Sequence, residues 1–361
     1  MRSKLLFVIV VFTLIFGFTL PILAQEDEDC ENSSCVEVAQ SATIIGLSEE
    51  AISTYQEPQF TSPVVDTSLL HDRRYQQVTG AAPIYDAPNG TLLRTLDAGF
   101  NFFTILQVTQ DGWTQINTNE WVPSQFLTDT NYVVSEFTGI FLPEAMPEHS
   151  IAWMLINAYP SSVPGGNPLE SNGLLYRYTR INIYATVELD GWRWYQIGVD
   201  KWLHQTSVAK IIPIERPETV TTERWVMIDL YEQVMIAYEG DAPVFATLVS
   251  SGLPRWPTFE GTYNIYYRRV RHDMSWGTPG DDFYMLEEVP WTMFFDEGRA
   301  LHGAYWHNGL GYRRSHGCVN LSITDANWLY EWVAEEFDNF NSPDIEEGPN
   351  VYVYSSGEYI E

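Results

Sequence analysis

The chain has 361 residues, enough for two or three domains, and 45% of them are apolar, so ordinary hydrophobic cores can form. Nineteen Lys and Arg residues against 48 Asp and Glu residues give a formal net charge of −29 at pH 7. A field of that sign repels nucleic acid, which argues against a nucleic-acid-binding role. The 13 Trp and 21 Tyr residues, with abundant Gly and Pro, favour short strands and tight turns over helical bundles.

Residues 1–24 have the layout of a secretory signal peptide. Arg2 and Lys4 precede an apolar run from Leu5 to Leu20, and Ala24 is a small residue at the expected cleavage point. The run is shorter than the roughly 20 residues that a spanning helix needs, which favours cleavage over the alternative, an uncleaved membrane anchor. We therefore expect an exported protein of the cell envelope or the extracellular space, tethered at its start if the segment is retained.

Residues 25–75 are predicted to be an acidic, disordered linker. Ser, Thr, Gln, Glu and Pro dominate this stretch, and it has no hydrophobic periodicity. Cys30 and Cys35 lie close together in it and could pair with each other, and no histidine is near enough in sequence to suggest zinc. The remaining cysteine, Cys318, is then a lone thiol in an exported chain.

Two similar segments follow, at residues 76–130 and 150–212. Asp111-Gly112-Trp113 in the first is echoed 79 residues later by Asp190-Gly191-Trp192 in the second, and each is followed by a strand-like run and a second Trp. Short strands with turn signals such as Asn89-Gly90 predict small barrels. Each copy resembles a bacterial SH3-like domain. That resemblance implies a module that binds cell-wall glycan; the alternative is a spacer.

A third domain is expected at residues 223–355, after a proline-containing linker. Alternating apolar residues predict strands at 225–230, 233–238, 244–250, 262–267, 291–295 and 351–354. One helix is predicted, because Ser322 and Asp325 have capping-box spacing. Its apolar stripe comprises Ala326, Leu329, Val333 and Phe337.

The residues that point to chemistry gather between 302 and 320. Cys318 follows His316-Gly317, and His302, Arg313 and Arg314 stand nearby in sequence. A thiolate is the reactive form of cysteine, and neighbouring cationic groups are expected to lower the thiol pKa. A histidine can take the thiol proton and return it to a leaving amine, and backbone N–H groups can stabilise an oxyanion.

Ser315-His316-Gly317-Cys318-Val319-Asn320, preceded by His302-Gly303, resembles the signature of the L,D-transpeptidases, exported enzymes that remodel peptidoglycan. Ser250-Ser251-Gly252 and the segment 257–263 match a further family motif, with Phe259 and Tyr263 as departures. The resemblance covers residues 223–354. The expected fold is mainly β, with two small SH3-like β-barrels followed by a β-sandwich that carries one packed α-helix.

The resemblance implies a role for each residue of the motif. Cys318 is the nucleophile and His302 the general base and acid, which the carbonyl of Gly303 orients. Ser315, His316 and Asn320 shape the loop, and the N–H groups of Gly317 and Cys318 are oxyanion candidates. No metal or organic cofactor is required.

The implied reaction passes through a thioester. The thiolate attacks the carbonyl of the third residue of a peptidoglycan stem peptide and releases the D-alanine at position four. The acyl group is then transferred to a second stem, which forms a 3→3 cross-link. Alternatives are an L,D-carboxypeptidase, in which water is the acceptor, and a non-catalytic cell-wall-binding protein. His307 is a rival for the base, and a zinc site formed by Cys318 and the nearby histidines is a further alternative.

Some arginines near the motif are expected to contact the carboxylates of the substrate. Five of the sixteen flank the motif and form a local positive island in an acidic chain: Arg268, Arg269, Arg271, Arg313 and Arg314. The planar guanidinium suits the carboxylates of a stem peptide, and Arg314 is the first candidate. Tyr305 and Trp306 are also expected to contact substrate. The alternative is that the arginines belong to solvated strand faces.

Overall fold

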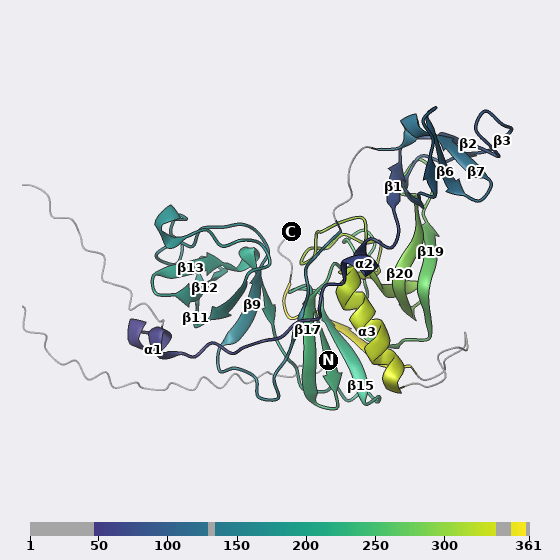
Figure 1. Cartoon of the computed structure of the whole chain (residues 1–361). Helices are drawn as coiled ribbons and strands as arrows, with labels where there is room; N and C mark the ends of the chain where they lie inside the picture. Colours follow the sequence, from purple (N-terminus) through teal and green to yellow (C-terminus); the bar gives the residue numbers. More distant parts are fainter. Residues whose placement is uncertain (1–46, 129–133, 337–347, 359–361) are drawn as a thin grey trace, which may run out of the picture. The chain divides into compact units, whose positions relative to one another are not determined.

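The structure, a computed structural model, describes residues 47–128, 134–336 and 348–358. The predicted signal peptide and the Cys30–Cys35 pair lie outside these residues. Within the described part the chain is mainly β, as predicted, with short helices and one long one, α3 (Figure 1). None of the described helices has the length and apolar character needed to cross a membrane.

Residues 223–355, the domain that resembles the L,D-transpeptidases, are called the catalytic region. Its first sheet, which also includes β8 from earlier in the chain, has six strands in the order β18-β23-β15-β16-β17-β8. The last strand, β23, pairs in parallel with β15, and the other neighbours are antiparallel. Its strands are β8 (Ile140–Phe141), β15 (Arg224–Asp229), β16 (Val234–Glu239), β17 (Ala242–Leu248), β18 (Gly261–Asn264) and β23 (Asn350–Tyr354). Five of the six correspond to strands predicted from the sequence.

The second sheet has the order β1-β4-β20-β21-β22, with β19 paired to β20. A long antiparallel hairpin, β19 and β20, forms its largest part. The catalytic-region strands are β19 (Tyr267–Trp276), β20 (Tyr284–Asp296), β21 (Arg299–Gly303) and β22 (Val319–Leu321). Only the end of β20 was predicted from the sequence. Gly277 and Gly280 between two aromatic-rich runs are the turn signal that could have revealed the hairpin.

The two sheets and helix α3 (Ile323–Glu336) enclose one apolar core, which makes a sandwich with the helix packed on it. Phe245 comes from the first sheet, Met293 and Leu301 from the second, and Leu329 and Val333 from the helix, and all are buried. Ser322 caps the helix as predicted, because its Oγ accepts the Asp325 N–H at 3.1 Å.

The first module (75–127) is not a separate barrel. Its five-stranded sheet has the order β3-β2-β7-β6-β5, but β1 (Tyr75–Val78) and β4 (Phe100–Thr104) continue the second catalytic sheet through β20. The expected self-contained domain at 76–130 therefore shares a sheet with the domain that follows. The remaining elements are β2 (Ala82–Tyr85), β3 (Leu92–Leu96), β5 (Gln107–Val108), β6 (Trp113–Asn117), β7 (Glu120–Pro123) and the 3₁₀ turn η1 (Ser124–Phe126).

The second module consists of two three-stranded sheets, β10-β9-β14 and β11-β12-β13. Trp153 and Ile211 from it share a core with Trp225, Ile236 and Leu248 of the first catalytic sheet, so the module covers the face opposite the sandwich core. Its elements are β9 (Ser150–Met154), η2 (Glu170–Asn172), β10 (Arg180–Ile183), β11 (Ala185–Leu189), β12 (Trp192–Gly198), β13 (Lys201–His204), η3 (Gln205–Ser207) and β14 (Val208–Ile211). The SH3-like likeness of both modules stays a prediction.

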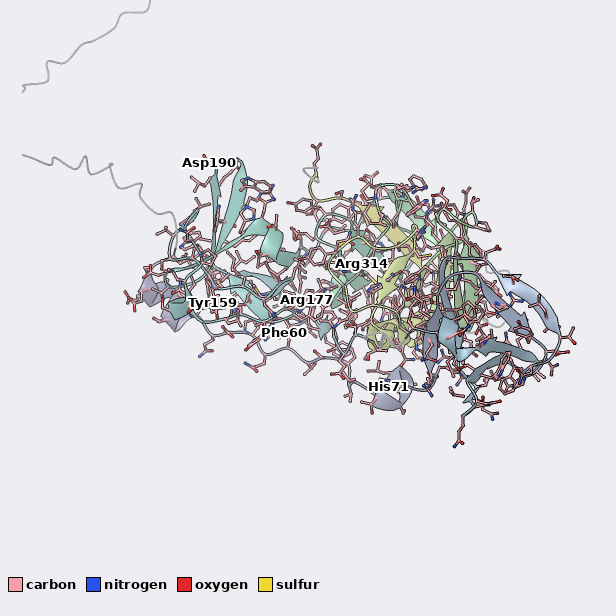
Figure 2. All side chains as sticks on the ribbon, turned by 90° about the horizontal axis from the view of Figure 1, so that it is seen from above. Phe60, His71, Tyr159, Arg177, Asp190 and Arg314 are labelled. Atoms are coloured by element: carbon pink, nitrogen blue, oxygen red, sulfur yellow. The ribbon has the colours of Figure 1, made fainter. Side chains whose placement is uncertain are left out.

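Residues 47–75 correct the prediction of a disordered linker through to 75. This stretch forms helices α1 (Glu49–Thr54) and α2 (Thr67–Leu70), capped by Ser48 and Asp66. Between them, the Thr61 carbonyl accepts the Phe141 N–H at 2.8 Å, and the ring of Phe60, labelled in Figure 2, lies 4.4 Å from the Arg180 guanidinium. Contacts with distant strands, invisible in the composition, give the stretch a defined path.

The packing of α3 can be tested by truncating one core side chain. Leu329→Ala should lower the free energy of unfolding by about 2–5 kcal/mol, because Leu329 is fully buried between the helix and both sheets. Glu331→Ala, on the exposed side of the same helix, should change it by less than about 0.5 kcal/mol. Urea unfolding of the full chain measures both, and equal effects would contradict this packing.

Candidate active site

Strand pairing brings the predicted base and nucleophile together. β21 and β22 are parallel, with Leu301 opposite Val319 and His302 opposite Asn320. Leu301 and Val319 are fully buried in the sandwich core. Because side chains alternate along a strand, His302 and Asn320 lie on the other face, and Cys318, two residues before Asn320, is directed the same way.

His302 is held in one tautomer. Its ring is buried, and Nδ1 lies 3.1 Å from the carbonyl oxygen of Gly303, the contact expected from the motif. A carbonyl oxygen only accepts, so Nδ1 carries the ring proton and Nε2 keeps its lone pair. Burial lowers the pKa of His302 to about 4, so the imidazole is neutral at pH 7. A neutral ring with an open Nε2 is the form that can accept a proton.

The Cys318 thiol differs from the sequence-based expectation. Burial raises its pKa, and this outweighs the lowering by the backbone N–H of Ala300 and by the charge of Arg299. The expected net lowering by nearby cations is therefore wrong in direction. The Cys318 thiol and the His302 imidazole line the same cavity, and both are neutral at rest.

The Ser315 side chain holds the loop before Cys318 in place by two hydrogen bonds. Its hydroxyl donates to the Cys318 carbonyl and accepts the Gly317 N–H at 3.1 Å. Gly317 has a φ of +110°, and a Cβ there would come within 2.8 Å of Arg299 Nε. The Gly317 carbonyl accepts from Thr258 Oγ1 at 2.8 Å, a support that the sequence analysis missed. Because its N–H is already bonded, Gly317 is not an oxyanion donor, which leaves the Cys318 N–H as the backbone candidate.

His307, the rival base, has both nitrogens occupied. Nδ1 accepts the Gly309 N–H at 3.0 Å, so the ring proton sits on Nε2, which lies 2.8 Å from the Asn320 carboxamide nitrogen. The His307 Nε2–H and the Asn320 NH₂ group are both donors and therefore cannot bond to each other as placed. Asn320 Oδ1 is buried without a partner among the described residues. If the Asn320 carboxamide is turned by 180°, its oxygen accepts the His307 Nε2–H, and its NH₂ group takes the former position of the oxygen. Burial also lowers the pKa of His307 to about 3, with Arg314 and Arg177 adding to the shift.

Two cavities meet at Cys318 and His316. The first, about 580 Å³, is also lined by His302 and Asn320, and by Trp306, Arg313 and Arg314. The second, about 490 Å³, is lined by Trp256, Trp276, Arg255, Arg299, Asp273 and Glu297, among others. The ring of His316 stacks on Trp256 with 3.8 Å between centroids. Cys318 can therefore be approached from either cavity.

Of the residues predicted to contact substrate, some line the first cavity and one is buried in the protein. Trp306, Arg313 and Arg314 line the first cavity, and Arg314, labelled in Figure 2, also donates from Nε to the Gly309 carbonyl at 3.2 Å. Tyr305 does not fit the prediction, because it is fully buried and its hydroxyl donates to the Glu287 carbonyl at 2.9 Å. Its contact is with the protein core.

The other three arginines of the predicted island lie on β19, and none of them lines the first cavity. Arg268 donates to the Tyr330 carbonyl at 2.8 Å, Arg269 stacks on Tyr267 at 4.4 Å, and Arg271 forms an ion pair with Asp72. These three arginines therefore fit the alternative, in which arginines of the island belong to strand faces. Arg299, which the sequence analysis did not single out, is the arginine that acts on the thiol.

Metal binding is not supported by any side-chain group in the described ranges. No three His, Cys, Asp or Glu side chains gather there as a metal site would require. The zinc alternative involving Cys318 and the histidines therefore has no geometric support among these residues.

Comparison with known proteins finds a family that this part of the chain resembles. The family profile of the L,D-transpeptidase catalytic domain (YkuD) matches residues 223–353. The matched part of the chain, which contains His302 and Cys318, is similar to L,D-transpeptidase catalytic domains. Members of this family are acyltransferases with a cysteine nucleophile, which agrees with the place of Cys318 in the cleft.

Two relatives illustrate the match. YciB of Bacillus subtilis, named for the same activity, is 27% identical over 136 residues, which cover 34% of this chain and 66% of YciB. L,D-transpeptidase 3 of Mycobacterium tuberculosis is 34% identical over 91 residues, which cover 23% of this chain and 34% of that protein. The chain thus spans less than two thirds of the length of either relative.

Solved structures of the family also match. A crystal structure of L,D-transpeptidase 3 from M. tuberculosis aligns with a TM-score of 0.31 and 20% identity, over 50% of this chain and 76% of that one. An L,D-transpeptidase from Xylanimonas cellulosilytica aligns with a TM-score of 0.27 and 26% identity, over 38% and 64%.

The electrostatic role of Arg299 gives a direct test. Arg299→Gln should shift the pH dependence of Cys318 alkylation by iodoacetamide to higher pH, because a charge that favours the thiolate is lost. Arg94→Gln, on the first module, should leave the alkylation profile unchanged. Coincident profiles for Arg299→Gln and the wild type would show that this guanidinium does not act on the thiol.

Proposed function

We propose that this protein is an exported L,D-transpeptidase that acts on peptidoglycan stem peptides and forms 3→3 cross-links. The observation that carries the proposal is the fixed tautomer of His302, a residue that lines the same cavity as Cys318. The family match at residues 223–353 supports the reaction class.

In the first half-reaction, His302 Nε2 takes the Cys318 proton and the sulfur attacks the carbonyl carbon of the third stem residue. The tetrahedral oxyanion accepts a hydrogen bond from the Cys318 N–H. The C–N bond to the terminal D-alanine breaks, and His302 returns the proton to the departing amine. The product is a thioester on Cys318 and free D-alanine.

In the second half-reaction, the side-chain amine of another stem peptide attacks the thioester carbonyl. His302 takes a proton from the amine and gives it to the leaving thiol, so the enzyme returns to its neutral pair. Water in place of the amine would give an L,D-carboxypeptidase. A non-catalytic wall-binding protein has less support, because Cys318 and the oriented His302 lie in one cavity.

The charges of the two cavities favour one placement of the substrates. Arg313 and Arg314 in the first cavity suit the carboxylates of the donor stem. The carboxylates of Asp273 and Glu297 in the second suit an acceptor amine, because both arginines there are paired: Arg299 with Asp296 at 2.9 Å and Arg255 with Asp281 at 3.3 Å. The donor is therefore proposed to enter on the arginine side and the acceptor on the acidic side.

We also propose that the chain is exported through residues 1–24 and that the second module contacts wall glycan. Trp192 and Trp194 flank His204, with ring centroids 4.8 and 5.1 Å from it, and all three are partly exposed. Such rings can pack against the apolar faces of sugars.

The reaction is tested by mass spectrometry of a purified disaccharide-tetrapeptide incubated with the enzyme. A transpeptidase yields a dimer lighter than two monomers by one alanine, and Cys318→Ala yields none. A monomer shortened by one alanine, without dimer, would identify a carboxypeptidase instead. If the folded wild-type protein forms neither product, the proposal that it is an enzyme is refuted.

The buried base predicts an unusual pH profile. His302 acts as a base only when neutral, and a pKa of about 4 keeps it neutral at neutral pH, with loss of the base as the pH falls through 4. The kcat/KM for cross-linking should therefore hold from pH 7 to about pH 5 and then fall. Enzyme incubated at low pH and assayed at pH 7 controls for unfolding. An acid limb near 6.5, the ordinary value for histidine, would contradict the burial of this base.

A further inference from the structure

We propose that the first module is part of the active site, in which Phe100 is a specificity-determining residue that contacts the apolar part of the donor stem peptide. The inference rests on the proposed function for the identity of the ligand. Phe100 begins β4, lines the first cavity beside Trp306 and Leu286, and is 42% exposed. An exposed aromatic ring in the wall of a catalytic cavity is free to contact substrate.

Strand addition places Phe100 there. β4 pairs in parallel with β20, with Phe100 opposite Tyr284 and Phe102 opposite Leu286. The Phe100 N–H donates to the Phe283 carbonyl at 3.0 Å. Gly99 permits this approach, because a Cβ at that position would clash with the same carbonyl. Main-chain bonds of this kind fix the register of the module against the hairpin.

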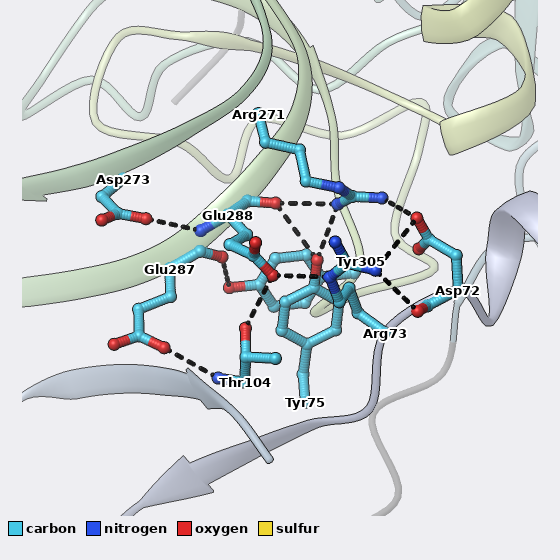
Figure 3. Close-up of polar contacts among 9 residues, drawn as sticks. All are labelled: Asp72, Arg73, Tyr75, Thr104, Arg271, Asp273, Glu287, Glu288 and Tyr305. Carbon is cyan, nitrogen blue, oxygen red and sulfur yellow. Dashed lines mark hydrogen bonds and ion pairs between the residues drawn. The ribbon is translucent and has the colours of Figure 1, made fainter. Parts of the chain in front are cut away.

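A polar network holds the same interface together (Figure 3). Arg73 Nε donates to Glu288 Oε2 at 2.8 Å, and the Thr104 hydroxyl donates to the same oxygen at 3.1 Å. The Thr104 N–H donates to Glu287 Oε2 at 2.9 Å. From β19, the other strand of the hairpin, Arg271 donates to the Tyr75 hydroxyl at 2.9 Å and forms the ion pair with Asp72. Both strands of the hairpin are thus bound to residues 72–104.

Stacked rings connect this interface with the catalytic loop. Tyr75 lies flat on Tyr305, with 3.5 Å between centroids and 4° between planes, and both are buried. Trp306 meets Tyr305 edge-on at 4.9 Å and lies 5.5 Å from the His302 ring. The burial of Tyr305, which excludes it from substrate binding, is therefore explained by its role in docking the module.

The wall formed in this way is apolar. Met274, Tyr284 and Leu286 come from the hairpin and Phe100 from the module, whereas Arg313 and Arg314 belong to the loop before Cys318. A stem peptide has both carboxylates and aliphatic carbon. The arginine side of the cavity suits its carboxylates and the apolar side its aliphatic part, and together they orient the peptide across Cys318. Removal of Phe100 should weaken donor binding without changing the chemistry at sulfur.

The test compares Phe100→Ser with Leu92→Ser. Leu92 is a matched control, because it is an exposed apolar residue (53%) of the same module that does not line the cavity. With disaccharide-tetrapeptide as donor, Phe100→Ser should raise KM about tenfold at unchanged kcat, as expected for a lost apolar contact. Leu92→Ser should leave KM unchanged. Thermal unfolding and the rate of Cys318 alkylation confirm that both variants keep the fold and the thiol.

Binding measured without turnover separates this inference from the proposed function. In a Cys318→Ala background, calorimetric titration with the same tetrapeptide should show about a tenfold higher Kd for Phe100→Ser and no change for Leu92→Ser. Equal Kd values for Phe100→Ser and its background would overturn the inference, as would equal weakening by both substitutions. Absence of dimer with the wild type, together with the Phe100-dependent Kd, would reject the proposed reaction but keep Phe100 as a binding residue.

Discussion

The parallel pairing of β21 with β22 is the constraint on which the site depends. Leu301 and Val319 anchor the two strands in the sandwich core, and the alternation of side chains then presents His302 and Cys318 on the opposite face. The backbone supplies the remaining parts of the site. The Gly303 carbonyl fixes the imidazole, and the Ala300 N–H faces the thiol. A shift of one residue in this register would turn the base into the core.

Burial sets the chemical character of the pair. It lowers the pKa of His302 and raises that of Cys318, so both groups rest neutral. A neutral resting thiol is protected from reaction in the absence of substrate, because the thiolate is the nucleophile. In the proposed mechanism, charge is created only when the thiol proton moves to His302 Nε2.

The sequence predicted the features that depend on local pattern. Five of the six strands of the first catalytic sheet follow from alternation, and the start of α3 follows from Ser322. What it could not predict depends on contacts between distant residues. Phe100 and Tyr284 are neighbours in space but far apart in the chain, so the shared sheet was invisible. The burial of Tyr305 and the structural roles of Arg268 and Arg271 follow from that same assembly.

The direction of the Cys318 pKa shift shows a second limit. Nearby cations are visible in a sequence, whereas the loss of water around a thiol is not, and here desolvation is the larger effect.

The central claim is that Cys318 carries the acyl group between the two stem peptides. Intact-protein mass spectrometry of enzyme mixed with disaccharide-tetrapeptide, followed by mapping of the modified peptide, tests it most directly. The account predicts an adduct equal to the donor without its terminal alanine, on the peptide that contains Cys318, and no adduct on Cys318→Ala. Cross-linked product formed by Cys318→Ala, or an adduct on another residue of the wild type, would contradict it.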